Sequence, residues 1–119
     1  MKPKYDLEER TAKFGEEVIL FCKTLLQDSI SRSLISQLVR SATSIGANYM
    51  EANNASSRKD FRNKIFISKK ESQETKHWLR MLKTYFPDKE AELRELWNEA
   101  HELTMIFQKV TNSLKNSKN

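Results

Sequence analysis

The chain has 119 residues, the length of one domain, and is too short for an enzyme built from two domains. Its 21 Lys and Arg outnumber its 16 Asp and Glu, so the net charge is +5, and two Gly, two Pro and one Cys exclude collagen-like proteins, most all-β designs and a disulfide framework. The sequence has no apolar run long enough to cross a membrane and no signal peptide, so we expect a single cytoplasmic domain over residues 1–119, with no membrane partner.

The first of four predicted helices spans residues 7–27. Asp6 can accept hydrogen bonds from the free amides at its start, and Glu9, three residues later, completes a capping box. Residues at alternating spacings of four and three then form one seam, which comprises Leu7, Thr11, Phe14, Val18, Phe21 and Leu25. A polar break at residues 27–29 precedes a second helix, predicted over residues 32–54. Its seam comprises Ile35, Leu38, Ala42, Ile45, Tyr49 and Ala52.

The third predicted helix spans residues 58–85. Ser57 with Asp60 forms its capping signature, and Pro87 ends it because the proline ring cannot continue the hydrogen-bond ladder. The seam comprises Phe61, Ile65, Ser68, Ser72, Thr75, Leu79 and Leu82. Its small polar members allow close approach of backbones, and their hydroxyls can bond the carbonyl one turn back.

The last helix is predicted over residues 89–114, with Asp88 as its cap. Its seam comprises Leu93, Leu96 with Trp97, Ala100, Thr104, Phe107, Thr111 and Leu114. Four long helices joined by short loops run antiparallel to their neighbours. The sequence therefore predicts an all-α fold, the antiparallel up-down-up-down four-helix bundle.

A second apolar stripe on the first helix indicates self-association. A bundle helix needs one stripe for its own core, so a second one favours contact with another copy of the chain. Gly15 is costly inside a helix and fits a close contact there. The predicted interface comprises Ala12, Gly15, Ile19, Cys22 and Leu26, together with Ile67 and Trp78 of the third helix. The alternative is that the stripe wraps into the core of its own protomer.

Positive charge is concentrated on the third helix. Residues 58–83 contain nine basic and three acidic residues, a surplus larger than the +5 of the whole chain. Residues 88–102 carry six acids against two bases. The basic residues form a band along one flank, a pattern typical of proteins that bind a phosphate backbone. The predicted nucleic-acid-binding residues are Lys59, Arg62, Phe66, Lys69, Lys76, Arg80 and Lys83, with Phe66 placed to stack a base. The alternative is a solvated face partly neutralised by the acidic last helix.

Patterns for catalysis or metal binding are weak. Glu74 and His77 have the Glu-x-x-His spacing of di-iron bundles, but that site needs a second such motif and two more inward glutamates. Cys22 has no histidine nearby in sequence to activate it, and His101 stands alone. No nucleophile with a base and an orienting partner can be assembled. We expect a non-enzymatic protein with no catalytic residues, no metal site and no cofactor.

The central part of the chain resembles a known family. The motifs are LVRSATSIGAN at residues 38–48, Glu51-Ala52, Ser57 with Asp60-Phe61, Lys70-Glu71, and ETKHWL at residues 74–79. Together they resemble the four helix bundle protein family, also called 23S rRNA intervening sequence proteins or S23 ribosomal protein-like. The resemblance implies a bundle that assembles as a homopentamer and a nucleic-acid role, since relatives are encoded within intervening sequences of ribosomal RNA. It implies no catalysis. A distant relative is the nucleic-acid-binding accessory protein of a reverse transcriptase.

Two functional hypotheses follow. The first is a non-catalytic, oligomeric helical-bundle protein that binds RNA or DNA through the basic flank of the third helix. The second is a protein–protein scaffold or an accessory subunit of a nucleic-acid enzyme, such as a reverse transcriptase. Asn48 and Glu51 lie off the core seam, where they either bond to a neighbouring helix or subunit or face solvent.

Overall fold

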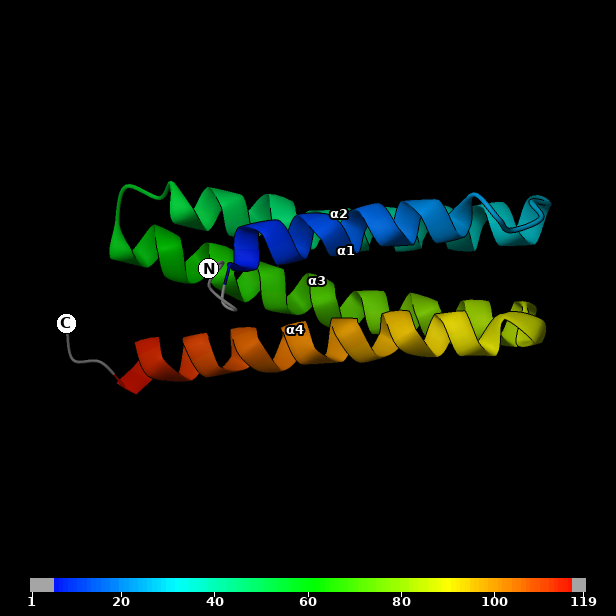
Figure 1. The fold of residues 1–119 in the computed structure, drawn as a ribbon. Coiled ribbons are helices and arrows are strands. Elements are labelled where there is room, and N and C mark those ends of the chain that lie inside the picture. Colours follow the sequence, from blue (N-terminus) through cyan, green and yellow to red (C-terminus); the bar gives the residue numbers. More distant parts are fainter. Residues whose placement is uncertain (1–5, 117–119) are drawn as a thin grey trace.

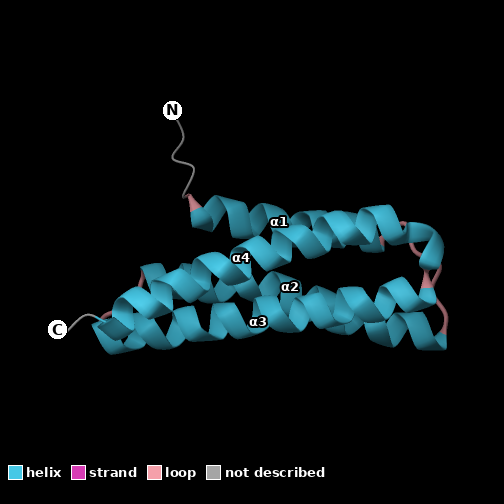
Figure 2. Ribbon diagram, turned by 90° about the horizontal axis from the view of Figure 1, so that it is seen from below, coloured by secondary structure: helices cyan, strands magenta, loops and turns pink. Residues whose placement is uncertain are grey.

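The described residues, 6–116, form four long helices in a computed structural model of the chain. The helices are α1 (Leu7–Cys22), α2 (Ser29–Asn53), α3 (Arg58–Tyr85) and α4 (Glu90–Asn116), and a 3₁₀ turn, η1 (Pro87–Lys89), precedes α4. The helices lie along a common axis, with α1 and α2 in one layer and α3 and α4 in the other (Figure 1). Figure 2 shows the connecting loops gathered at the two ends. The predicted antiparallel four-helix bundle is confirmed.

The start of α2 differs from the prediction. The helix begins at Ser29, not at residue 32, because Asp28 caps it instead of belonging to the break. The Asp28 carboxylate accepts the N–H groups of Ile30 and Ser31, each at 2.9 Å. The Ser31 hydroxyl in turn accepts the Asp28 N–H at 2.9 Å. This reciprocal capping box satisfies the first amides of the helix.

Helix α1 ends at Cys22, not at residue 27. Two residues of the predicted interface, Cys22 and Leu26, differ from the expectation. Leu26 lies beyond the helix and is 80% exposed. Cys22 is buried in the protomer's own core, where Phe21 was expected, and Phe21 is only half-buried. An ideal helix drifts by about 20° per heptad against a 3.5-residue repeat, so the inward position falls one residue later by the last turn of α1. Burial also raises the pKa of the Cys22 thiol to about 11.

Side-chain caps at the other helix starts follow the sequence, except before α4. The Asp6 carboxylate accepts the Glu9 N–H at 3.2 Å, and the Ser57 hydroxyl accepts the Asp60 N–H at 3.0 Å. Asp88 lies inside η1 and is not an N-cap, because the chain tightens into this 3₁₀ turn directly after Phe86. The prediction that Asp88 caps the last helix is therefore wrong.

The core contains hydroxyl groups that connect helices. Ser72 and Thr104 join α3 to α4 with 2.8 Å between their oxygens, and Thr75 donates to Ser41 of α2 at 2.9 Å. Ser68 donates to a carbonyl oxygen of α2 at 3.1 Å. Around them lie large buried side chains from all four helices: Phe14, Leu38, Ile45, Ile65, Leu79, Leu82, Leu103 and Phe107. Hence the small polar residues of the α3 seam hold the central helix to both neighbours.

The close helix contact lies at Gly46 and not at Gly15. A Cβ atom on Gly46 would stand 3.1 Å from the Thr11 hydroxyl and 3.3 Å from the Thr11 carbonyl carbon. A Cβ atom on Gly15 would make ordinary contact, 3.5 Å from Thr43. Gly15 therefore packs against α2 of its own chain.

The bundle is flattened, with principal extents of 50, 32 and 21 Å. Each helix packs on its neighbour in sequence, whereas α1 and α4 make few contacts with each other. Arg10 of α1 bridges this seam to Glu99 and Glu102 of α4, at 2.7 and 2.8 Å. These two carboxylates, Glu99 first, raise the pKa of Arg10 above its ordinary value.

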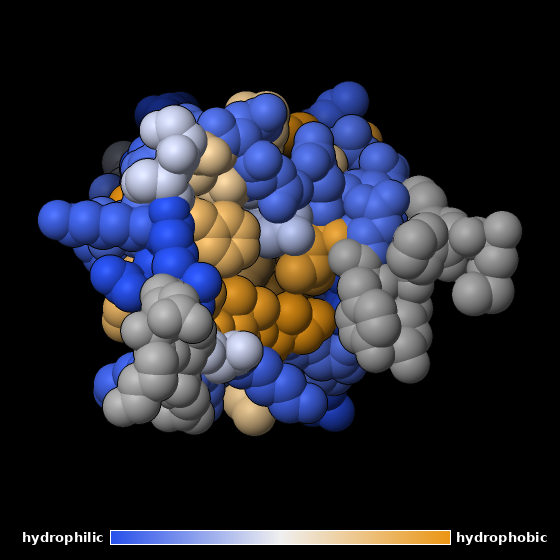
Figure 3. Space-filling view, turned by 90° about the vertical axis from the view of Figure 1, so that its left-hand side faces the viewer, coloured by the Kyte–Doolittle hydropathy of each residue, from blue (hydrophilic) through white to orange (hydrophobic). Residues whose placement is uncertain are grey.

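Apolar side chains are visible at the end of the bundle where α1 begins, inside a ring of hydrophilic ones (Figure 3). Half-buried Phe61 and Val110 extend the core toward this end. Along the helices the outward faces are mainly polar, but they also expose large apolar side chains, such as Ile19, Met50 and Phe66. Within residues 6–116 the longest helices are too polar to be candidates for crossing a membrane.

Candidate nucleic-acid interface

The basic band follows one edge of α3 because of the heptad spacing of the buried seam. Four of its cations each come one residue after a seam position, so they project on the same side of the helix. The structure places this edge against α4. The four residues are Arg62, Lys69, Lys76 and Lys83.

One part of this edge forms a hollow of about 420 Å³ with the C-terminal half of α4. Lys69 Nζ donates to Gln108 Oε1 at 2.9 Å and lies 5.2 Å from the centre of the Phe66 ring. Phe66 is 52% exposed. Arg62 and Lys115 border the same hollow. The hollow therefore combines three cations with an accessible aromatic face.

Further along the edge, Lys76 meets two aromatic rings of α4. Its Nζ lies 3.0 Å from His101 Nδ1 and 5.1 Å from the centre of the Trp97 ring. His101 and Trp97 stack with an interplanar angle of 12°. Lys76 is thus held by the His101 imidazole and the Trp97 ring, and no carboxylate within the described residues pairs with it.

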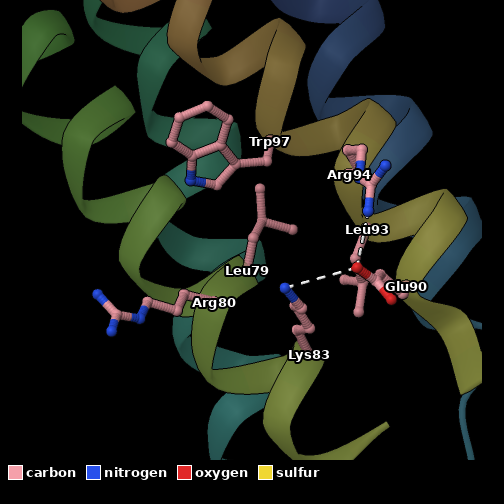
Figure 4. Close-up of a pocket in the computed structure, with 7 residues that line it drawn as sticks. All are labelled: Leu79, Arg80, Lys83, Glu90, Leu93, Arg94 and Trp97. Atoms are coloured by element: carbon pink, nitrogen blue, oxygen red, sulfur yellow. Dashed lines mark hydrogen bonds and ion pairs between the residues drawn. The ribbon is translucent and has the colours of Figure 1, made fainter. Parts of the chain in front are cut away.

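The edge ends in a pocket of about 270 Å³ near the α3–α4 connection. Figure 4 shows the Trp97 indole beside Leu79, with Arg80 pointing to one side and Lys83 facing Glu90. Glu90 pairs with Arg94 at 2.7 Å and with Lys83 at 3.6 Å. Arg94 first, and then Lys83, lower the pKa of Glu90 below its ordinary value. The pocket is lined by Leu79, Arg80, Lys83, Glu90, Leu93, Arg94 and Trp97, and we call it the Trp97 pocket.

The remaining predicted residues form an outer row. Lys59 and Arg80 are exposed, and Phe66 lies between them on the same face of α3. We use the term α3–α4 groove for the two hollows and the edge between them. It comprises Arg62, Phe66, Lys69, Lys76, Arg80 and Lys83 of α3 with Glu90, Arg94, Trp97, His101, Gln108 and Lys115 of α4.

Two acidic residues of α4 are turned toward α1 instead of this groove. Glu99 and Glu102 bind Arg10 of α1. On the other flank of α3, Glu71 and Glu74 bind Arg40 of α2. Among the described residues, the ion pairs of the predicted band are limited to Lys83 with Glu90. Neutralisation of the band by the acidic last helix, the alternative stated in the sequence analysis, is therefore confined to one end of the band.

Sequence reasoning missed the contribution of α4 to the groove. Trp97 was assigned to the core seam, yet it is 37% exposed, and His101 was taken as an isolated surface residue. Gln108 and Arg94 were not singled out. Their spacing along α4 does carry a signal, because residues 94, 97, 101, 108 and 115 follow one another at intervals of three, four and seven. This row can be assigned to the groove only because the structure shows that the basic edge of α3 faces α4.

The predicted interface residues do not share one surface. Ala12 and Ile19 are exposed along a groove between α1 and α2, which also includes Gly15. Ile67 and Trp78 lie on α3, which does not contact α1. Trp78 is half-buried. Of the expected stripe on α1, Cys22 and Gly15 are buried, whereas Leu26 is exposed in the connection after the helix.

Polar residues of the central motif bond within the chain. Glu51 pairs with Lys64 of α3 at 2.7 Å, whereas Asn48 donates to the carbonyl of Ser44 in its own helix.

The Glu-x-x-His pair takes part in other contacts. Glu74 accepts the Trp78 indole N–H at 3.2 Å and pairs with Arg40 at 2.6 Å, and these contacts, Trp78 first, lower the pKa of Glu74. His77 packs edge-on against Trp78. In the part of the chain that the structure describes, no three His, Cys, Asp or Glu side chains gather as a metal site would require.

Comparison with known proteins identifies a family and solved structures with a similar fold. Residues 4–109 match the sequence model of the family described as 23S rRNA-intervening sequence protein. A crystal structure from Bacteroides thetaiotaomicron, described as a protein of unknown function from the S23 ribosomal protein family, is 30% identical with a TM-score of 0.80. The alignment covers 87% of this chain and 96% of that one. None of the curated proteins matches the sequence.

Proposed function

Because the chain belongs to the 23S rRNA-intervening sequence protein family, we propose that it is a non-catalytic protein that binds RNA through the α3–α4 groove. The family name connects its members with ribosomal RNA, and an RNA ligand presents a dense row of phosphates. The groove offers a row of cations to such a backbone.

The observation that carries this proposal is the segregation of charge across the bundle. The cations of the groove come from both α3 and α4, and Glu90 is the carboxylate that pairs with them among the described residues. The other acids of α4 that form ion pairs are held by Arg10 on the opposite side. Surface cations that no carboxylate neutralises can replace the counterions condensed on the phosphates of RNA, and the release of those counterions favours association at low salt.

Reversing two charges of the groove tests the proposal. We expect Lys69→Glu with Lys76→Glu to weaken binding of ribosomal RNA fragments about equally for all sequences, because phosphate contacts carry no sequence information. The slope of log Kd against log salt should fall by about two. Fluorescence anisotropy over a salt series measures both quantities.

The matched control reverses two exposed lysines of the first helix and its end, Lys13→Glu with Lys23→Glu. This variant has the same net charge as the test variant but leaves the groove intact. Equal loss of affinity in both variants would mean that only overall charge attracts RNA, and unchanged binding in the groove variant would reject the groove as the site.

Self-association is the second element of the proposal. Large apolar side chains are exposed on and around α1 and α2: Ile19, Leu20, Leu26, Ile30 and Met50. A second copy covering them would remove this surface from water. The resemblance stated above implies five copies. An assembly would repeat the groove, and several weak contacts on one RNA would then act together.

A further inference from the structure

The Trp97 pocket differs from the rest of the groove because it combines a flat aromatic wall with an apolar floor. Leu79 and Leu93 form the floor, and the Trp97 indole is 37% exposed above it (Figure 4). Arg80 is exposed at the rim and forms no ion pair within the described residues. A ligand that matches these three features has a planar, largely apolar ring and an anionic group beside it.

The size of the pocket limits what it can hold. Its volume of about 270 Å³ is smaller than the roughly 300–1,000 Å³ of sites that enclose a whole small molecule. A single ring with its attached phosphate outside, at the rim, is consistent with this size. Glu90 holds Lys83 and Arg94 on one side of the rim, so Arg80 is the cation left to meet the phosphate.

Contacts with His101 and Lys76 restrain the position of the indole before any ligand binds. His101 stacks on Trp97 with ring centres 5.1 Å apart, and Lys76 Nζ lies 5.1 Å from the indole centre. A side chain that is already ordered loses little conformational entropy when a ligand stacks on it. The indole is thus a preorganised surface for an aromatic partner.

We propose that the Trp97 pocket takes one unpaired nucleobase, so that the α3–α4 groove selects single-stranded or looped RNA over duplex RNA. This inference rests on the proposed function. Within a duplex the faces of the bases are stacked on one another, and a protein side chain reaches only edges, sugars and phosphates. In an unpaired segment a base can turn outward and stack on an indole while its phosphate meets Arg80.

The test compares three RNAs with the unaltered chain: an unstructured single strand, the same strand in abasic form, and a duplex of equal length. We expect the single strand to bind at least about fivefold more tightly than the abasic strand, the low end of stacking contributions. In a Trp78→Phe background, Trp97 is the remaining tryptophan, and its fluorescence should be quenched by the single strand and not by the abasic strand.

Two variants separate stacking from charge. Trp97→Leu should lower affinity for the single strand toward that for the abasic strand while leaving the salt slope unchanged, because stacking releases no counterions. Trp78→Leu, on the α2 side of α3, is the matched control and should leave affinity unchanged. Thermal unfolding of each variant verifies that it is folded. The comparison of the three RNAs uses the unaltered chain and does not depend on whether a variant folds.

Failures of the two proposals give different results. Equal affinity for the single strand, the abasic strand and the duplex, with the salt dependence retained, would overturn base stacking and leave the groove as a phosphate-binding surface. The absence of binding to all three RNAs would overturn the proposed function as well.

Discussion

Two glycines with similar positions in the sequence pattern have different physical roles. Gly46 lies where α2 approaches the backbone of Thr11, and a Cβ atom there would be closer than ordinary packing allows. Gly15 faces Thr43 with room for a methyl group. Periodicity alone cannot distinguish the two, because the distinction depends on how closely α1 and α2 pack.

Alanine substitution at the two glycines should therefore have different effects. Gly15→Ala should raise the free energy of unfolding by about 0.5–1 kcal/mol, the usual gain when alanine replaces glycine in a helix. Gly46→Ala has the same helical gain but must displace Thr11, so we expect it to be at least about 1 kcal/mol less stable than Gly15→Ala. Urea unfolding followed by circular dichroism measures both. Equal stabilisation by the two substitutions would contradict the close contact at Gly46.

At the scale of elements, the turn between α1 and α2 is tied to the end of α3. Asp28 caps α2, and the Tyr85 hydroxyl of α3 donates a hydrogen bond to the same carboxylate. These bonds, that of Tyr85 first, lower the pKa of Asp28 below its ordinary value of 3.8. A local cap thus acts as a tertiary connection as well.

This connection predicts a loss of stability in acid. Because the carboxylate binds its proton less readily in the folded state than in the unfolded state, its contribution is complete above pH 3.8 and declines as the pH falls through the lowered value. Asp28→Asn should have a lower Tm at neutral pH and a smaller decline of Tm below pH 3.8 than the unaltered chain. Thermal unfolding across this pH range measures the difference.

The control for this experiment is Asp88→Asn, which removes an exposed carboxyl from η1. It should reproduce the acid dependence of the unaltered chain. The prediction is rejected if the Tm of Asp28→Asn and the Tm of the unaltered chain fall by the same amount as the pH is lowered.

At the scale of the whole molecule, the bundle distributes its surfaces between two faces. The α3–α4 groove collects cations, whereas the surface around α1 and α2 exposes apolar side chains. Arg10, Glu99 and Glu102 hold α1 to α4 and at the same time keep two carboxylates out of the groove. An assembly formed through the apolar face leaves the cationic face open to RNA.

A charge placed on the apolar face should disrupt assembly. Ile19 is 41% exposed on α1, and Ile19→Glu should lower the mass of the particle in sedimentation velocity without unfolding the protomer, because an unpaired carboxylate would have to be buried at the contact. Met105→Glu introduces the same charge at an exposed position of α4 and should leave the mass unchanged.

An unchanged mass for Ile19→Glu would exclude this face as a contact between copies. A protein partner would then be the alternative occupant of the exposed apolar residues, as in the accessory-subunit hypothesis.

The sequence by itself determined the helices, most of the buried seams and the basic edge of α3. Each of these depends on the repeat of a single helix, so Ser57 as a cap, Leu79 in the core and Lys69 on the edge follow from spacing alone. Spacing did not predict that Cys22 instead of Phe21 is buried near the end of α1. The rotation of a helix about its axis depends on how it packs against its neighbours, and the repeat drifts along the helix.

Only the tertiary structure decided which helix lies beside the basic edge and which charges remain unpaired there. Trp97 and His101 lie 21 and 25 residues after Lys76 in sequence and meet it only because α3 and α4 pack in one register. The acids of α4 are numerous in sequence, yet Glu99 and Glu102 turn to Arg10. Such pairings depend on how all four helices pack together. The periodic pattern of a single helix carries no information about that packing.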